Sequence, residues 1–304
     1  MSAGSPSPLA DARLSRRLAA RLLGGAGVVA LTASRFPLSP GTASAAADPF
    51  VPSIQKENTT MSQATPTTGL TVALVHGAFA DSSSWNGIIP LLQQAGVNVT
   101  AIPNELRGVA SDSAYVASAL NQIPGPVLLV GHSYGGVVIT NAGSMASNVV
   151  GLVYVAGFAT DEGETLGGLE SGSKDSVLVS ALLPRQYPTG NGAETATEFL
   201  IDPAKVQEAF AGDLSAADCA IIAATQRPIS EICFAEPTKS PAWKTLPTWA
   251  IVATGDKAAG TDILRLTAER AGATTVEIDA SHVVMVSQPQ AVTDVIMTAI
   301  AAVS

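Results

Sequence analysis

The sequence predicts an α/β fold in which a mostly parallel sheet is covered by helices on both faces. Short apolar runs alternate with helical stretches from residue 70 onwards, and no hairpin signal joins neighbouring core strands. The composition, 47% hydrophobic and only 13% charged, is typical of a chain with a large buried core. The third observation is the run 127–138, Val-Leu-Leu-Val-Gly-His-Ser-Tyr-Gly-Gly-Val-Val. There an apolar strand leads directly into Gly-x-Ser-x-Gly and a helical stretch.

The first 47 residues have the pattern of an export signal rather than of a folded domain. Arg16-Arg17 precede an alanine- and leucine-rich stretch that extends to about Ala33, and 43–47 offer small residues for cleavage. The paired arginines favour the twin-arginine route and therefore a periplasmic or secreted protein. The alternative is an extension outside the fold, with translation starting at Met61 in a cytoplasmic protein. Residues 48–69 are interpreted as a linker and 70–304 as the folded domain.

Charge and cysteine content restrict the classes of partner. Residues 48–304 hold 11 basic and 24 acidic side chains, a net charge of −13. This acidity argues against nucleic acid or an anionic membrane as a partner, and the sequence leaves the oligomeric state open. The two cysteines, Cys219 and Cys233, could form one disulfide or be two small buried residues. No His or Cys spacing suggests a structural metal site, and no cofactor is expected.

Four apolar runs predict the strands of the first half of the sheet, at 71–75, 97–102, 127–130 and 149–156. Ser83 or Ser84 can cap a helix that ends at Gly96. The apolar face of this helix would consist of Trp85, Ile88, Ile89 and Leu92. A second helix is predicted over 114–123 and a third over 136–145. This order is typical of strands joined by helical crossovers.

The regular pattern is interrupted between residues 160 and 245, where glycine, proline and acidic residues become frequent. This segment is predicted to be a helical cap insertion of small helices and loops, with helices near 203–210 and 215–225. Regular α/β order returns with a strand over 247–254, a helix over 261–271 and a strand over 274–278. The final helix is predicted over 289–303.

Ser133 is the candidate nucleophile, because it lies in the Gly-x-Ser-x-Gly turn between a strand and a helix. Gly131 and Gly135 allow this turn to be sharp, since a side chain at either position would obstruct the close approach of strand and helix. The turn lifts the Ser133 hydroxyl clear of the sheet. It also places the N-terminus of the following helix behind it.

A serine hydroxyl needs a neighbouring base, and the base needs an orienting acid. His282, on a loop between the last strand and the last helix, is the candidate base. His132 is expected to point away from the nucleophile, and His76 is expected to be a structural hydrogen-bonding residue. Asp256 is the candidate acid because it follows the strand that ends near residue 254, and nucleophile, acid and base then come in the order Ser133, Asp256, His282.

Three other carboxylates are less suited to the role of the acid. Asp161 also follows a strand, Asp262 is better interpreted as a residue of a first helical turn, and Asp279 is too close to His282 in sequence.

The oxyanion that forms on a carbonyl under attack requires backbone N–H groups. The expected donors are the amides of Tyr134, directly after the nucleophile, and Ala78, in the His-Gly-Ala-Phe turn after the first strand. The alternative for that turn is an ordinary strand-to-loop connection. The expected substrate pocket includes Phe79 and Trp85, together with apolar residues of the insertion such as Leu182 and Phe199.

These motifs together resemble the α/β-hydrolase superfamily, and in particular its small serine esterase branch. Leu74-Val75-His76-Gly77-Ala78, Pro90-Leu91-Leu92 and the segment 130–136 resemble plant methylesterases and hydroxynitrile lyases. Ala280-Ser281-His282 is similar to the C-terminal motif of bacterial carboxylesterases. The resemblance covers about 70–160 and 245–303, and the insertion 160–245 has no counterpart in it. The lyases carry a lysine near the acid, where this sequence has Lys257.

The resemblance implies an α/β-hydrolase fold and a hydrolase that cleaves a small-molecule carboxylic ester through an acyl-enzyme intermediate. Ser133, His282 and Asp256 would form its triad. A cofactor-free lyase or a perhydrolase on the same fold is the alternative. A further alternative is a non-catalytic small-molecule receptor.

Overall fold

The computed structural model describes residues 69–304. The predicted export signal, Met61 and all of the predicted linker except Gly69 lie outside the described residues. No helix within residues 69–304 combines the length and apolar character needed to cross a bilayer.

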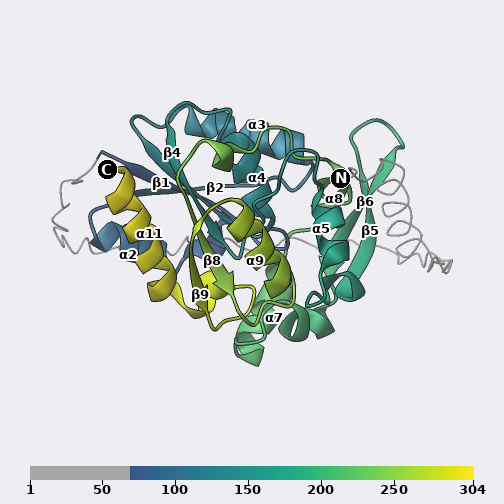
Figure 1. Ribbon diagram of the computed structural model, residues 1–304. Helices are drawn as coiled ribbons and strands as arrows, with labels where there is room; N and C mark the ends of the chain where they lie inside the picture. The colour runs from purple at the N-terminus through teal and green to yellow at the C-terminus, as the bar shows by residue number, and fades with distance from the viewer. Residues whose placement is uncertain (1–68) are drawn as a thin grey trace, which may run out of the picture.

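The centre of the molecule is a sheet of six strands that all run parallel (Figure 1). The strand order is β2-β1-β3-β4-β8-β9. The strands are β1 (Thr71–Val75), β2 (Asn98–Ile102), β3 (Val127–His132), β4 (Val149–Val155), β8 (Thr248–Ala253) and β9 (Thr274–Ile278). All six were predicted from apolar runs, with ends that differ by no more than two residues. Strands β3 and β8 are buried along their whole length, because helices cover the sheet on both faces.

Helices on opposite faces follow from the direction of each crossover. The chain moves from β1 to β2 and then turns back past β1 to β3, so right-handed connections place α2 on one face and α3, α4 and α9 on the other. The contacts agree, because α3 packs on α4 whereas α2 packs on the C-terminal helix α11. These helices are α2 (Ile89–Gln94), α3 (Val109–Leu120), α4 (Tyr134–Ala142), α9 (Thr261–Arg270) and α11 (Pro289–Val303).

Helix α4 begins two residues before and ends three residues before the predicted 136–145, and two other helix starts differ more from the prediction. Helix α3 begins five residues earlier than residue 114, because its buried face already starts at Val109 and continues through the polar Asp112 and Ser113, which conceal the apolar pattern. The helix expected after Ser83 or Ser84 is instead a 3-10 turn, η1 (Ser82–Trp85), followed by α2. Its cap is Asp81, whose carboxylate accepts the Ser83 N–H at 2.7 Å.

The segment between β4 and β8, which includes the predicted insertion 160–245, forms a cap at one side of the sheet (Figure 1). Its helical elements are α5 (Leu166–Gly172), η2 (Leu178–Ala181), η3 (Pro203–Lys205), α6 (Val206–Ala209), α7 (Ala216–Thr225), α8 (Ile232–Ala235) and η4 (Ala242–Lys244). The helices expected near 203–210 and 215–225 are therefore present.

The cap also contains a three-stranded antiparallel sheet that the sequence analysis did not predict. Strands β5 (Leu182–Pro188) and β6 (Thr195–Ile201) form a hairpin, and the short β7 (Ile229–Ser230) pairs with β6. Prolines such as Pro184 and Pro188 are rarely found inside strands, so the sequence did not indicate a strand here. However, β5 is an edge strand, which tolerates residues without an N–H donor.

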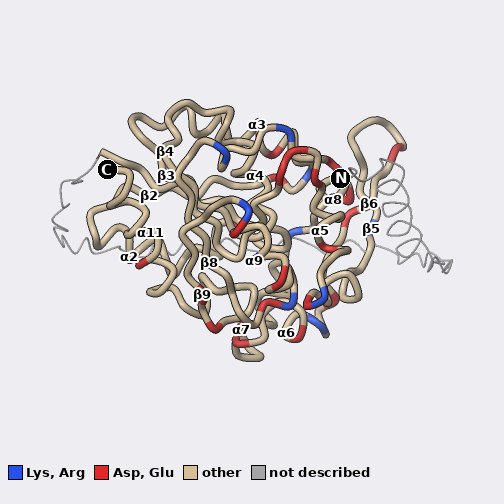
Figure 2. Tube along the Cα trace, viewed as in Figure 1, with Lys and Arg blue, Asp and Glu red and all other residues tan. Residues whose placement is uncertain are grey.

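Ion pairs fasten the cap to the core. The Arg107 guanidinium, on the loop before α3, lies 2.9 Å from Glu198 of β6 and 4.4 Å from the ring centroid of Tyr187 in β5. Arg270 at the end of α9 pairs with Glu164 and also donates to the Ala159 carbonyl. Along the backbone tube of Figure 2, acidic residues (red) lie on the cap elements and around β9, with basic residues (blue) between them.

Both cysteines are free and buried, so they are the two small buried residues of the prediction rather than a disulfide. Burial raises the pKa of the Cys233 thiol far above its ordinary value, which makes it an inert thiol.

Candidate active site

Ser133 is in a strained backbone conformation between β3 and α4, with φ 54° and ψ −124°. A non-glycine residue adopts a positive φ only where the surrounding structure enforces it. Three glycines allow the backbone around Ser133 to pack closely enough to impose this conformation. A Cβ on Gly131 would lie 2.5 Å from the Gly135 carbonyl oxygen, and one on Gly135 would lie 2.5 Å from the Val75 carbonyl oxygen. A Cβ on Gly77 would lie 2.6 Å from the Ser133 Cβ itself.

The site lies where the strand order reverses, between the adjacent strands β1 and β3. In a parallel α/β sheet, this switch point leaves a crevice at the carboxyl ends of the strands. Val75 pairs with Gly131, so the turns that follow the two strands, with Ala78 on one and Ser133-Tyr134 on the other, lie side by side. Neither the Ala78 nor the Tyr134 amide donates to a protein acceptor within residues 69–304. Both residues line the same cavity as Ser133.

His76 supports the turn that carries Ala78. Its Nδ1 lies 2.9 Å from the Gly77 carbonyl oxygen, and its Nε2 accepts the Asn104 N–H at 2.9 Å. Burial lowers the pKa of His76 to about 4, so the ring is neutral at pH 7 with its proton on Nδ1. This is the structural role that the sequence analysis expected of His76.

His282 and Asp256 form a buried pair. The His282 Nδ1 lies 2.6 Å from Asp256 Oδ2, and each side chain is almost fully buried. The other Asp256 oxygen accepts the amides of Ala258 and Ala259, both at 2.9 Å, which fixes the carboxylate. With the Nδ1 proton donated to Asp256, the neutral ring keeps the Nε2 lone pair free to accept a proton.

The structure brings Ser133 and His282 into one cavity, where Ser133 keeps 6% of its surface accessible. No hydrogen bond joins the two side chains within the described residues. Such bonds are often long before substrate binds and tighten in the reacting complex.

His132 contacts His282. Its Nε2 is 3.0 Å from the His282 carbonyl oxygen, and the two rings lie 4.7 Å apart. Complete burial, with His282 beside it, lowers the pKa of His132 far below its usual range, so it donates through Nε2–H as a neutral ring. It therefore holds the His282 loop. A second support comes from the cap, where Asp213 accepts hydrogen bonds from the Ser281 amide and hydroxyl.

The competing carboxylates have other partners. Asp161 lies 2.6 Å from the Lys244 ammonium, and Asp262 accepts from the Ser173 hydroxyl and the Lys174 amide. Asp279 is exposed, and so is Lys257, which does not line the cavity. Within residues 69–304, no cluster of three His, Cys, Asp or Glu side chains is arranged to bind a metal ion.

The cavity at Ser133 offers about 10 Å³ of free space, roughly the room for one water molecule. Phe79 and Phe210 pack edge to face at its boundary, with ring centroids 6.1 Å apart, and the Phe210 ring lies 5.0 Å from that of His282. Both phenylalanines also line a second cavity of about 260 Å³.

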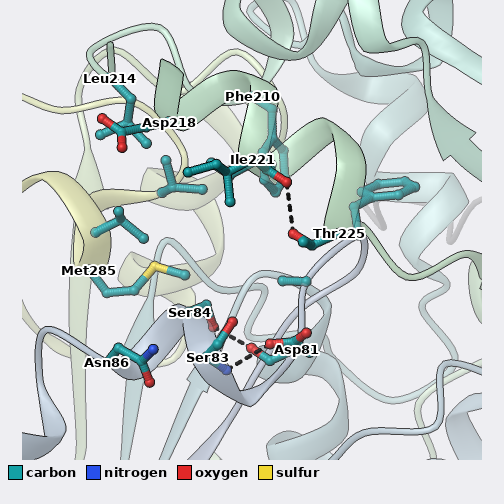
Figure 3. A pocket seen from close by; sticks show the side chains of 15 residues that line it. Asp81, Ser83, Ser84, Asn86, Phe210, Leu214, Asp218, Ile221, Thr225 and Met285 are labelled. Atoms are coloured by element: carbon teal, nitrogen blue, oxygen red, sulfur yellow. Dashed lines mark hydrogen bonds between the residues drawn. The ribbon is translucent and has the colours of Figure 1, made fainter. Parts of the chain in front are cut away.

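The second cavity, called the outer cavity here, lies between α7, α10 (Val284–Ser287) and the turn at Asp81 (Figure 3). Leu214, Ile221 and Met285 supply apolar surface on one side of the outer cavity, where the Asp218 carboxyl group also lies. The other side carries the polar Ser83, Ser84 and Asn86. The full lining consists of Phe79, Ala80, Asp81, Ser83, Ser84, Asn86, Phe210, Leu214, Asp218, Ile221, Ile222, Thr225, Val283, Met285 and Val286.

Of the two residues expected in the substrate pocket, Phe79 lines both cavities, whereas Trp85 lines neither. Trp85 is completely buried in the core, where its ring packs edge to face against His132. Leu182 and Phe199 are also absent from both cavities, because the unpredicted cap strands β5 and β6 place them elsewhere. Phe199 packs against Phe234.

Sequence reasoning missed Glu170, a buried carboxyl in helix α5 that lines the Ser133 cavity. Leu166, one helical turn earlier, lines it as well. The i, i+4 spacing of Leu166 and Glu170 predicts that both lie on one face of a helix. It does not predict that this face covers the Ser133 cavity.

A parallel α/β sheet with a serine at a strand-to-helix elbow and a buried histidine–carboxylate pair in the same crevice defines the α/β-hydrolase class of protein. The sequence matches the family model described as "Alpha/beta hydrolase family" over residues 72–295, so the chain belongs to the alpha/beta hydrolase family. A search of the curated proteins found no match.

Solved structures with the same fold include three named enzymes. Polyneuridine aldehyde esterase has a TM-score of 0.64 and 22% identity, over 75% of this chain and 98% of that one. A pyrethroid hydrolase from Sphingobium faniae JZ-2 has a TM-score of 0.61 and 20% identity, over 75% and 96%. Tomato methylketone synthase I in complex with 2-tridecanone has a TM-score of 0.61 and 21% identity, over 77% and 98%. At these identities the likeness shows the fold alone.

Proposed function

We propose that this hydrolase is a serine esterase that cleaves carboxylic esters of small molecules through an acyl-enzyme intermediate. One observation carries the proposal. The Ser133 side chain, at a strained elbow, shares a cavity with His282, whose Nδ1 lies 2.6 Å from the buried Asp256 carboxylate.

In the proposed first half-reaction, the Ser133 Oγ attacks the ester carbonyl carbon while its proton passes to His282 Nε2. Negative charge develops on the carbonyl oxygen, where the Ala78 and Tyr134 amides donate hydrogen bonds. Asp256 stabilises the imidazolium. The bond between the carbonyl carbon and the alcohol oxygen then breaks, and His282 returns the proton to the departing alkoxide.

In the second half-reaction, water attacks the acyl group on Ser133. His282 takes a proton from the water, the same two amides bind the oxyanion, and the bond to the Ser133 Oγ breaks. The acid leaves, and His282 returns the proton to Ser133. These steps use only side chains and amides of this chain and need no cofactor.

The outer cavity supports a substrate with a small apolar portion. Its free volume of about 260 Å³ suits a short aliphatic or single-ring group, and Ile221, Ile222 and Met285 supply apolar contact surface. Rotation of Phe210 or Phe79 would connect this cavity to Ser133.

The fold neighbours include an esterase and a pyrethroid hydrolase, which is consistent with ester hydrolysis. Methylketone synthase I shares the fold as well. For that reason, a cofactor-free lyase with the same three residues is the second candidate. Perhydrolysis and non-catalytic ligand binding are further alternatives that the same assay separates.

The test is turnover of p-nitrophenyl esters from acetate to octanoate by the full-length chain. Ester hydrolysis is expected, together with a covalent fluorophosphonate adduct on Ser133. Ser133→Ala should abolish both, because the Ser133 Oγ is the proposed nucleophile in both reactions. The matched control Ser118→Ala removes an exposed hydroxyl on α3 and should change neither. No turnover on any ester, with the fold intact by circular dichroism, would contradict the esterase assignment.

We also propose that the protein acts outside the cytoplasm, in keeping with the predicted signal over residues 1–47. N-terminal sequencing of the native protein tests this directly. Cleavage near Ala47 supports export, and a first residue at Met61 contradicts it.

A further inference from the structure

Glu170 differs from every other residue around the Ser133 cavity. Apart from Ser133 and His282, the side chains that line this space are apolar or aromatic, including Leu166, Leu178 and Phe234. Glu170 places a carboxyl group among them and keeps only 6% of its surface accessible. A carboxyl in such surroundings is costly to bury, and an aliphatic side chain would fill the same space at lower cost. Its presence therefore indicates a function beyond packing.

The distances around Ser176 favour a protonated Glu170 carboxyl. The Ser176 Oγ lies 2.6 Å from the Ala258 carbonyl oxygen and 3.1 Å from Glu170 Oε2. A hydroxyl has one proton, and a carbonyl oxygen can only accept, so the shorter contact takes that proton. The Ser176 Oγ then has lone pairs left for the Leu178 N–H, at 3.3 Å, and for a proton on Glu170 Oε2.

Electrostatics favour the same protonated form. Burial holds the pKa of Glu170 well above its ordinary value, and the nearby Asp256 and Asp262 carboxylates raise it further. A neutral Glu170 also adds no second negative charge beside the Asp256–His282 pair.

The remaining oxygen, Glu170 Oε1, makes no hydrogen bond within residues 69–304. With the proton on Oε2 held toward Ser176, Oε1 is a carbonyl-type acceptor without a donor. Glu170 lines the Ser133 cavity, and Oε1 is not among the fully buried side-chain atoms that lack a partner, so a water molecule or a ligand in this cavity can supply the donor. The neutral acceptor matches a hydroxyl group of the ligand, whereas a ligand carboxylate offers it no proton.

We propose that Glu170 is a specificity-determining residue whose Oε1 accepts a hydrogen bond from a hydroxyl group close to the ester carbonyl, so that the site selects hydroxy esters over their hydrocarbon analogues. This inference rests on the proposed esterase function for the kind of ligand, but recognition by Glu170 can be measured without turnover.

The experiment uses the full chain with Ser133→Ala, so that esters bind without being cleaved, and isothermal titration calorimetry measures the dissociation constants. Three ester pairs differ by hydroxyl against methyl. The first is ethyl 2-hydroxypropanoate with ethyl 2-methylpropanoate, the second ethyl 3-hydroxybutanoate with ethyl 3-methylbutanoate. The third, 2-hydroxyethyl butanoate with propyl butanoate, places the hydroxyl on the alcohol.

At least one pair is expected to bind with about a tenfold to hundredfold preference for the hydroxy ester, which corresponds to one hydrogen bond to a buried acceptor. Glu170→Leu on the same background should reduce this ratio to about one. Glu170→Gln should keep it, because its carbonyl oxygen can replace Oε1 and its NH₂ group can donate to Ser176.

The inference is overturned if no pair shows a preference, or if Glu170→Leu leaves the ratio unchanged, since a carboxyl that only anchors the Ser176 loop would not affect the ratio. Failure of the esterase function has a different signature. It appears as absent turnover of the same six esters by the chain with Ser133 intact, whatever their dissociation constants are.

Discussion

His76 should make the protein sensitive to mild acid. The neutral ring accepts the Asn104 N–H at Nε2 and lies against the Gly77 carbonyl through Nδ1. Protonation of Nε2 would remove that acceptor and place a charge in a buried site. Burial therefore lowers the pKa of His76 from 6.5 to about 4.

The sign and size of the effect follow from linkage. In the unfolded chain, His76 takes up a proton as the pH falls through 6.5, whereas the folded protein does not until about pH 4. The stabilisation is therefore present above pH 6.5 and is lost as the pH falls toward 4. The gap between the two pKa values corresponds to about 3 kcal/mol in total, of which about 2 kcal/mol is lost between pH 7 and pH 5.

The assay is urea unfolding at pH 7, 6 and 5, followed by tryptophan fluorescence, for the unmodified chain and for His76→Gln. Glutamine keeps an acceptor near the position of Nε2 but does not titrate. The variant should lose about 2 kcal/mol less of its unfolding free energy between pH 7 and pH 5. His132 and the carboxylates are present in both proteins, so their contributions to the pH dependence of the unfolding free energy cancel in this difference. Equal losses in the two proteins would refute the assigned protonation state.

Two further substitutions test the elbow and the pair that holds the base. Gly135→Ala should cost more than about 2 kcal/mol of unfolding free energy or prevent folding, because its Cβ would lie 2.5 Å from the Val75 carbonyl oxygen in β1, which cannot move. Gly172→Ala, whose Cβ would have no atom within 4 Å, is the matched control and should leave the melting temperature nearly unchanged. Asp256→Asn should lower kcat on p-nitrophenyl butanoate by about 10³–10⁴, because an amide no longer holds the His282 tautomer. The matched control is Asp161→Asn, at a carboxylate that pairs with Lys244 outside the site, and it should leave kcat within about twofold. A similar loss of kcat in both variants would show that Asp256 has no special role.

The central sheet could be predicted because its signals are local. Apolar runs such as 71–75 and 127–130 can be buried only in a sheet covered on both faces, and each helical stretch between them specifies a crossover. The elbow is local as well, since Gly131, Ser133 and Gly135 meet within one turn. The positions of Asp256 and His282 after late strands follow from the same pattern.

The cap could not be predicted to the same extent, because its pairing is not local. Strand β5 contains two prolines and is recognisable as a strand only beside β6, and β7 has two residues. Trp85 illustrates the same limit, since its large ring suits a pocket or a core equally well. Its contact with His132, far along the chain, places it in the core.

By itself, the sequence determined the parallel α/β architecture, the strained turn at Ser133 and the order of the residues proposed for the triad. These depend on backbone preferences and apolar periodicity, which neighbouring residues set. The tertiary structure decided what surrounds Ser133. It closed the cavity to about 10 Å³ behind Phe79 and Phe210 and brought Glu170 from the cap into that cavity. The physical reason is that the burial, and with it the protonation state, of such a carboxyl depends on groups distant in sequence, here Ser176 and Asp256.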